Sequence, residues 1–200
     1  MFEYLLALSL VWSVQINEKF ETAFLAANIY HEARGEPKEG QICIAYVTLD
    51  RAYDNKYYFG GPSIRSVVFK KNIREDGRET AEFSWWEHPS IPTDHHAMQI
   101  AWQIAKGTRS GSIARACNSS VRFYKNSSAA GPGGTCWFDR NTIFVETRWN
   151  HDFYRPHRSA PEWWRGTSQK CYTPAATTSA DVDRTVARLP RPRPERTAMN

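Results

Sequence analysis

The feature that most constrains this chain is an apolar helical pattern that ends abruptly between Ile29 and Pro37. Nearly every residue from Ala23 to Ala33 is small or apolar, so this helix is predicted to be buried on most of its sides. Gly35 permits the left-handed conformation that ends helices, and Pro37 disfavours helix in the residue before it. Glu32 is therefore predicted in the last turn of a buried helix, where the surroundings disfavour a charge.

The size and charge of the chain favour one compact domain followed by a basic tail. Its 200 residues, of which 41% are hydrophobic and 14% aromatic, suffice for a single sizeable core. The net charge of +5 arises mostly after Pro156, where eight basic side chains oppose four acidic ones. A basic tail is attracted to polyanions, but the body lacks the interleaved basic and aromatic residues of a nucleic-acid surface. Nucleic acid is therefore not a predicted partner.

Three regions are predicted along the chain. Residues 1–17 contain an apolar run, Tyr4 to Val14, that is too short to span a bilayer. A helix packed on the body is favoured here over an export signal, because no basic residue precedes the run and no small-x-small cleavage site follows it closely. Residues 18–156 form the main folded domain. Residues 157–200 form the tail, expected to be largely disordered after about residue 174, where proline and arginine alternate.

The periodicity changes from helical to alternating along the folded domain. Helices are predicted from about Glu18 to Arg34, from Lys38 to Tyr53, and from Thr93 or Asp94 to Gly107. Alternating or β-branched runs predict short strands at Val121–Tyr124, Thr142–Thr147 and Asp152–Tyr154. The expected fold class is α+β, with a mainly helical core and a small antiparallel β appendage.

The four cysteines do not form a metal motif. None is arranged as Cys-x-x-Cys, and no histidine pair has the i, i+4 spacing of a zinc-binding His-Glu-x-x-His helix. No metal and no cofactor is therefore predicted. Cys43 fits the apolar pattern of its helix, whereas Cys117 and Cys136 flank a loop rich in serine and glycine. A disulfide between these two in an oxidising compartment and a pair of free thiols both stay open.

Two interpretations of Glu32 follow from its position. Breaking a glycosidic bond requires an acid that is still protonated near neutral pH, and burial of a carboxyl group produces one. Alternatively, Glu32 or Glu36 only caps the helix after Pro37 or pairs with Arg34, since acids stabilise helix N-termini. The many aromatic side chains offer rings on which sugars stack, although each ring alone is more typical of a core.

Six ordered segments resemble the SleB-type cell wall hydrolases, a family that includes spore-cortex-lytic enzymes and bacteriophage proteins. They lie between Ala23 and Tyr154 and read IYHEARGEPKEGQ (29–41), LDR (49–51), SIRSVVF (63–69), EFSW (82–85), VRFYKN (121–126) and WNHDFY (149–154). The resemblance implies a lysozyme-like fold and makes Glu32 the general acid and base. It also implies a set of residues around the glycan: Glu36, Phe83, Ser84, Trp85, Tyr124, Asn150, His151 and Tyr154.

The resemblance further implies that residues 18–156 cut peptidoglycan glycan strands between N-acetylmuramic acid and N-acetylglucosamine. A lytic transglycosylase is the expected type. The alternatives are a hydrolytic muramidase, helped by Glu36 or Asp152, and a catalytically silent glycan-binding or virion structural protein. The expected setting is the bacterial cell wall or periplasm, or a host cell during phage lysis, and the expected state is a monomer. Membrane contact through the N-terminal segment or the basic tail stays open.

Overall fold

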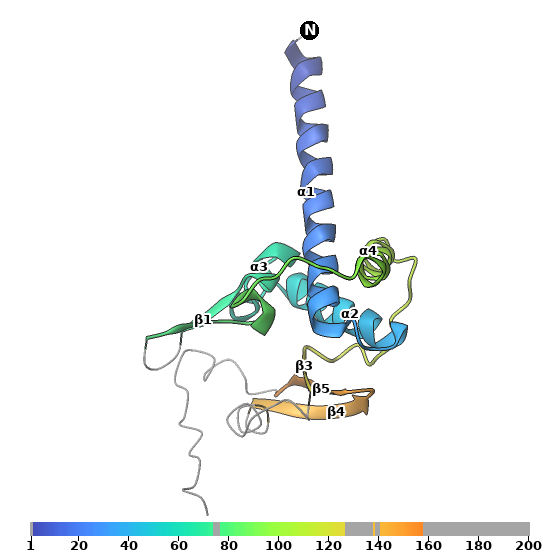
Figure 1. Cartoon of the computed structure of the whole chain (residues 1–200). Helices are drawn as coiled ribbons and strands as arrows, with labels where there is room; N and C mark the ends of the chain where they lie inside the picture. Colours follow the sequence, from blue (N-terminus) through green and yellow to red (C-terminus); the bar gives the residue numbers. More distant parts are fainter. Residues whose placement is uncertain (1, 74–76, 127–137, 139–140, 158–200) are drawn as a thin grey trace, which may run out of the picture. The chain divides into compact units, whose positions relative to one another are not determined.

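The computed structural model describes residues 2–73, 77–126, 138 and 141–157, with side chains from residue 15 onward. The chain divides into two compact units, Met1–Gln169 and Lys170–Asn200, and all described residues belong to the first. Its elements (Figure 1) are α1 (Phe2–Ala33), α2 (Lys38–Asp54), η1 (Tyr57–Phe59), α3 (Ile64–Val68), β1 (Lys71–Ile73), β2 (Glu79–Ala81), η2 (Ser84–Trp86), α4 (His95–Arg109), β3 (Phe123–Asn126), β4 (Thr142–Arg148) and β5 (His151–Pro156). The predicted α+β class, mainly helical with small antiparallel sheets, is confirmed and is consistent with a lysozyme-like fold.

Helices α1 and α2 meet at the predicted corner. α1 ends at Ala33 and α2 begins at Lys38, each within one residue of its predicted boundary. The N–H of Glu36 donates to the carbonyl of Ala33 over 2.9 Å, which tightens the turn. Pro37 is the N-cap of α2 with ψ of 158°, so the chain is extended there. The prediction that Gly35 adopts the left-handed conformation is wrong, because its φ is not positive. The extended backbone of Pro37 turns the chain instead.

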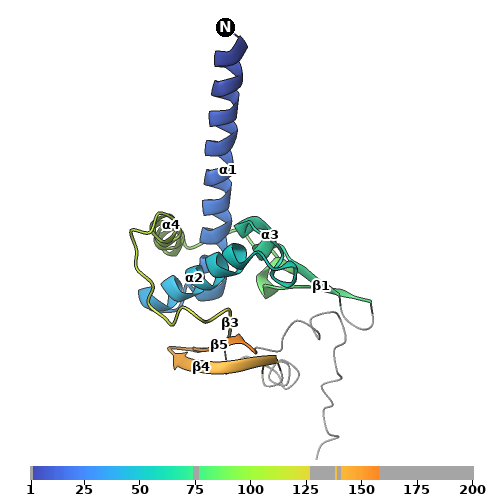
Figure 2. The same ribbon diagram turned by 180° about the vertical axis from the view of Figure 1, so that it is seen from behind.

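The first helix is longer than its sequence predicts. Instead of starting near Glu18, α1 runs unbroken from Phe2, since no glycine or proline interrupts residues 2–17. The ribbon of its first half extends away from the other labelled elements (Figures 1 and 2), and Ile16 and Phe20 are exposed. The expected helix of residues 4–14 is present, and its packing on the body stays a prediction. In the ranges that the structure describes, no helix has both the length and the apolar character needed to cross a membrane.

The helical core lies between α1, α2, α3 and α4. It consists of buried aliphatic side chains from all four helices, among them Leu25, Ile29, Ala45, Val68 and Ile104. Burying each large aliphatic side chain contributes about 1.5–3 kcal/mol, because apolar surface leaves water. Leu25 and Ile29 lie one turn apart on α1, so the last turns of this helix, which carry Glu32, are held firmly against the core.

The predicted β appendage is a three-stranded antiparallel sheet with the order β3-β5-β4. The three predicted strands overlap these strands, with boundaries that differ by no more than two residues. Side chains alternate along β5, so His151 and Phe153 are buried on one face while Asp152 lies on the other. Phe153 packs in one cluster with Cys43 and Val47 of α2, and this contact joins the sheet to the helical core.

The charged stretch from Lys70 to Glu82 contains a hairpin that the sequence does not predict. β1 and β2 pair antiparallel, with Lys71 opposite Ala81, and Lys71 forms an ion pair with Glu79 over 2.7 Å. The stretch lacks the alternation of apolar and polar residues by which strands are recognised, so the sequence gives no signal for the hairpin.

Two sequence predictions fall partly or wholly outside the described residues. Cys117 is free and buried in the same apolar cluster as Cys43, but Cys136 is not among the described residues. The pairing of Cys117 with Cys136 therefore stays a prediction. The disordered tail after residue 174 also lies beyond the described ranges.

Candidate active site

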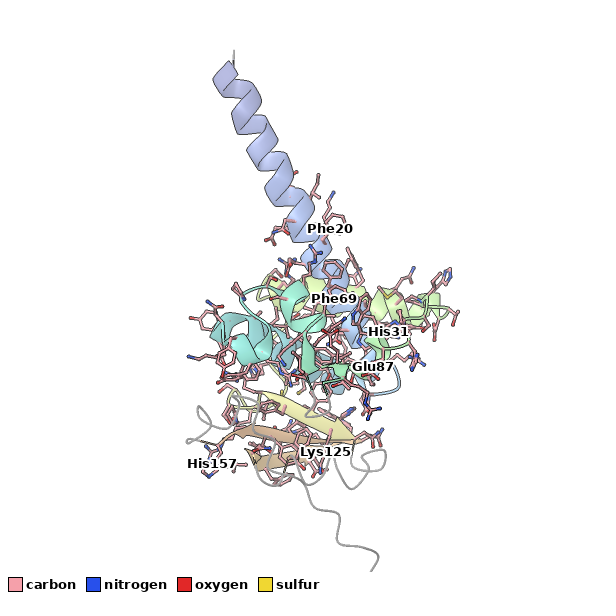
Figure 3. All side chains as sticks on the ribbon, turned by 90° about the vertical axis from the view of Figure 1, so that its left-hand side faces the viewer. Phe20, His31, Phe69, Glu87, Lys125 and His157 are labelled. Carbon is pink, nitrogen blue, oxygen red and sulfur yellow. The ribbon has the colours of Figure 1, made fainter. Side chains whose placement is uncertain are left out.

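A cleft of about 560 Å³ opens beside the last turn of α1, at the corner between α1 and α2. One wall comes from the helical part and the other from the sheet. Figure 3 labels His31 of the helical part and Lys125 of the sheet, which both belong to the lining. The lining residues are His31, Glu32, Ala33, Arg34, Gly35, Glu36, Ser84, Tyr124, Lys125, Asn126 and His151.

Glu32 is half-buried in this cleft and has a neutral partner. The hydroxyl of Tyr124 donates to Oε2 of Glu32 over 3.3 Å. Burial raises the pKa of Glu32 from its ordinary 4.5 to about 7, against the smaller lowering effects of the Tyr124 hydrogen bond and the Arg51 charge. Burial also raises the pKa of Tyr124, and the neighbouring Glu32 adds to this, so the tyrosine stays protonated as a donor. Glu32 can therefore release and take up a proton near neutral pH.

Arg51 has partners of its own, and these weaken the effect of its positive charge on Glu32. This buried guanidinium forms an ion pair with Glu82 over 2.9 Å and donates from Nε to the carbonyl of Arg122 over 2.6 Å. Its Cζ also lies 5.0–5.6 Å from the ring centres of Phe59, Phe83 and Phe123. Arg51 is thus held by its own partners, and Glu32 keeps a raised pKa despite a cation in the vicinity.

Glu36 anchors the turn between β4 and β5. Its carboxylate accepts hydrogen bonds from the Asn150 side chain (2.9 Å) and backbone N–H (3.4 Å). Nδ1 of His151 lies 3.4 Å from the same carboxylate, and burial lowers the pKa of this histidine although Glu36 and Asp152 favour its charged form. The carboxylate of Glu36 is therefore held by Asn150 and His151 of the opposite wall, whereas that of Glu32 accepts a hydrogen bond from the Tyr124 hydroxyl.

His31 and Trp85 form a second feature beside the cleft. Their rings stack with centres 4.6 Å apart and planes 12° apart. Nε1 of Trp85 donates to the buried Asn28 over 2.9 Å, and Asn28 donates to Thr48 of α2 over 3.1 Å. Burial lowers the pKa of His31, and the charge of Arg34 acts in the same direction. The stack is thereby fixed in place, with a neutral imidazole facing the cleft.

The structure brings together five of the nine residues singled out from the sequence as lining one cleft. These are Glu32, Glu36, Ser84, Tyr124 and His151. Asn150 and Trp85 reach the site through direct contacts with lining residues, as described for Glu36 and His31.

The remaining two predicted site residues lie in the core and not on the cleft wall. Phe83 is buried with Val67 and Ala52, and Tyr154 is buried with Phe59 and Phe123. Phe83 directly precedes the lining residue Ser84, and Tyr154 lies opposite Phe123, on the other face of the sheet from Tyr124. Phe83 and Tyr154 therefore lie behind the lining residues, and their contact with the glycan stays a prediction.

Sequence reasoning missed two charged lining residues, Arg34 and Lys125. Both lie inside segments that carry the family resemblance, so their position next to Glu32 and Tyr124 was the available signal. It also missed Arg51, whose role depends on contacts with Glu82 and Arg122 that are distant in sequence. No cluster of three or more metal-ligating side chains occurs in the part of the chain that the structure describes.

The family assignment follows from a comparison with known protein families. Residues 35–154 match the family described as Cell Wall Hydrolase, and this match covers more than half of the chain. The chain belongs to the SleB-type cell wall hydrolase family. No curated protein and no solved structure matches it.

Membership of this family makes peptidoglycan the substrate in general terms. The matched region includes Glu36, Ser84, Tyr124 and His151, four of the cleft residues, but it begins three positions after Glu32. The match therefore says nothing of Glu32, and the prediction that it is catalytic depends on its own surroundings: the cleft, the Tyr124 hydroxyl and the raised pKa.

Proposed function

We propose that this cell wall hydrolase is a lytic transglycosylase that cuts peptidoglycan between N-acetylmuramic acid and N-acetylglucosamine, with Glu32 as its general acid and base. The observation that carries the proposal is the pKa of Glu32, raised to about 7 beside a neutral donor in the cleft. A carboxyl group with such a pKa can give up a proton in one step and accept one in the next at the same pH.

The reaction requires only one such group. Protonated Glu32 donates its proton to the glycosidic oxygen, and the bond from that oxygen to C1 of the muramoyl residue breaks as positive charge develops on the sugar. The Glu32 carboxylate then takes the proton from the C6 hydroxyl of the same sugar. The C6 oxygen bonds to C1 and closes a 1,6-anhydro ring, which restores protonated Glu32 without consuming water. Tyr124, which donates to Glu32 over 3.3 Å, stabilises the carboxylate between the two steps.

The state of the other carboxylates supports this chemistry over hydrolysis. A muramidase needs a second carboxylate to activate a water or to attack the sugar. Glu36 is the one other carboxylate among the described lining residues, and Asn150 and His151 already engage it. Asp152, the other expected helper, lies on the opposite face of β5 from His151 and accepts a hydrogen bond from Thr147 over 2.6 Å.

The experiment that tests the proposal combines digestion of purified peptidoglycan with mass spectrometry of the muropeptides. A lytic transglycosylase gives 1,6-anhydromuramoyl products, which are lighter by one water than the products of a muramidase. Hydrated products with full activity would identify a muramidase instead. Binding to peptidoglycan without any cleavage, in a zymogram or in solution, would favour the silent glycan-binding or virion structural protein.

The proposed place of action is the bacterial wall or periplasm, or a host cell during phage lysis, and the proposed active form is a monomer. The cleft lies within one chain, and its lining comes from α1, the turn that follows it, η2, β3 and β5. Fractionation of the producing cells and light scattering of the purified protein would test these two points.

A further inference from the structure

Two buried cysteines from distant parts of the chain meet where the sheet packs on the helices. Cys43 lies on α2, and Cys117 lies in the segment that connects α4 to β3. Both belong to one cluster of buried side chains, which also contains Val47 of α2 and Phe153 of β5. Both thiols are free, and they share a hydrogen bond. Contact between two thiols is the first requirement for a disulfide between them.

The two thiols are not equivalent, because their surroundings favour the thiolate on only one of them. The hydrogen bond with Cys43 lowers the pKa of Cys117, burial opposes this effect, and the positive charge of Arg115 adds to it. The same hydrogen bond raises the pKa of Cys43, and burial acts in the same direction. Cys117 is also the more exposed thiol, at 9% against 0% for Cys43. Since the thiolate is the form that attacks a disulfide, Cys117 is the sulfur that reacts first.

The segment that carries Cys117 is held on both sides of the thiol. Arg115 forms an ion pair with Asp50 of α2 over 2.7 Å. The side chain of Arg148, the last residue of β4, donates from Nη1 to the carbonyl of Ala116 over 2.7 Å. These contacts keep the Cys117 backbone next to both α2 and the sheet. A bond from Cys117 to α2 would therefore join the helical core covalently to the segment that leads into the sheet wall of the cleft.

We propose that Cys43 and Cys117 form a disulfide in an oxidising compartment, and that this bond fixes the sheet wall of the cleft to α2. The proposal does not depend on the proposed function, because it concerns the stability of the folded domain and not the way in which the glycan is cut. Cys117 is also the cysteine for which the sequence leaves a disulfide with Cys136 open. The two pairings exclude each other, since one sulfur forms one disulfide.

The oxidation takes place by exchange with a small disulfide such as glutathione disulfide. The Cys117 thiolate attacks one sulfur of this oxidant, so that a mixed disulfide forms and one glutathione thiolate leaves. The Cys43 thiol then loses its proton and attacks the Cys117 sulfur, which forms the Cys43–Cys117 bond and releases the second glutathione. In sum, two cysteine thiols are oxidised and one disulfide is reduced to two thiols.

Peptide mapping of the full-length wild-type protein tests the pairing. The protein is reduced, refolded in a buffer of reduced and oxidised glutathione, and treated under denaturing conditions with N-ethylmaleimide, which blocks the remaining thiols. Trypsin then places the four cysteines on four separate peptides. We expect mass spectrometry to find one linked pair of peptides, containing Cys43 and Cys117, that separates on reduction. A link from Cys117 to Cys136 or Cys171, or Cys43 and Cys117 without a link, would overturn the proposal.

Thermal unfolding of the oxidised and reduced forms measures what the bond contributes. A cross-link between positions so far apart in the chain restricts the unfolded state, and we expect it to raise the melting temperature of the wild type by about 5–10 °C. The Cys136→Ala/Cys171→Ala variant keeps only the proposed pair and should show the same difference between its two forms. The matched Cys43→Ala/Cys117→Ala variant should show none.

Comparing the two redox forms of one variant removes the effect of the substitutions themselves from the result. Equal melting temperatures of the oxidised and reduced Cys136→Ala/Cys171→Ala variant would contradict the proposal. A full difference in the Cys43→Ala/Cys117→Ala variant would also contradict it, because the stabilising bond would then lie elsewhere in the chain.

Discussion

Two half-buried glutamates near Arg51 differ in their pKa shifts, and the contrast between them explains the site. Glu82 forms ion pairs with Arg51 (2.9 Å) and Lys70 (3.5 Å), and although burial favours its neutral form, these charges lower its pKa. Glu32 accepts one hydrogen bond, from the neutral Tyr124, and burial raises its pKa to about 7. Burial acts in the same direction on both groups, so the partners decide whether a buried carboxyl group is a structural anion or a proton donor.

The two glutamates also depend on each other through Arg51. Glu82 forms the ion pair with the Arg51 guanidinium, so Arg51 does not form one with Glu32. The Arg51–Glu82 ion pair is thus consistent with the raised pKa of Glu32. Four predictions test this contrast, in order of decreasing expected effect.

Removing the titratable group at position 32 should have the largest effect. Glu32→Gln should lower peptidoglycan cleavage by about 10³-fold, because general acid–base catalysis is lost while the size of the side chain is kept. Turbidity loss of a peptidoglycan suspension measures it, with the folded state checked by circular dichroism. Glu39→Gln, an exposed change in the first turn of α2, is the control. Full activity of the folded Glu32→Gln variant would remove the catalytic assignment.

Removing the structural partner should mainly affect stability. Glu82→Gln leaves the buried Arg51 without its carboxylate, and this should lower the free energy of unfolding by about 3 kcal/mol. Urea denaturation measures the loss. Glu79→Gln removes the carboxylate of an exposed pair with Lys71 and should change the same quantity by less than about 1 kcal/mol. Similar losses in both variants would show that the Arg51–Glu82 pair is not special.

The raised pKa of Glu32 should make the stability depend on pH. The folded state holds the proton more tightly than the unfolded chain, so this contribution is fully present below about pH 4.5 and is lost as the pH rises through about 7. Between these limits the wild type should lose about 2–3 kcal/mol of unfolding free energy relative to Glu32→Gln. Urea titrations of both proteins at pH 4.5, 6 and 8 measure the difference, and a constant difference would contradict the raised pKa.

The smallest expected effect comes from the neutral partner. The Tyr124 hydroxyl lowers the pKa of Glu32, so Tyr124→Phe should raise this pKa further, by less than about one unit. The fall in rate at alkaline pH, where the acid form of Glu32 is lost, should shift upward by the same amount in a pH–rate profile. Tyr53→Phe, at a residue that is 90% exposed, should leave the profile in place. A downward shift in Tyr124→Phe would be against the assigned hydrogen bond.

Local signals in the sequence predict the parts of the fold that depend on neighbours along the chain. Pro37 marks the corner after α1, and the spacing of apolar residues predicts α2 and α4. The hairpin of β1 and β2 is not predicted, because its strands lack the alternation of apolar and polar residues by which a strand is recognised.

The candidate site is predictable to the same extent. The position of Glu32 at the end of a buried helix follows from the sequence, and the resemblance adds Ser84, Tyr124 and His151. The contacts that hold the sheet wall in place cannot be predicted from the sequence, since Glu36 and Asn150 are 114 positions apart in the chain. For the same reason, sequence alone does not separate Tyr154, which is buried behind the wall, from Tyr124, which faces the cleft.

The glycine at position 40 sets how far apart the two walls can stand. A Cβ there would lie 3.0 Å from the Cβ of Glu36 and 3.2 Å from Cε3 of Trp149, closer than side chains normally approach. Trp149 itself has a φ of 55°, so the turn that carries it has little freedom to retreat. An alanine at position 40 would therefore require Glu36 or Trp149 to move, and through Glu36 this change would reach the lining of the cleft.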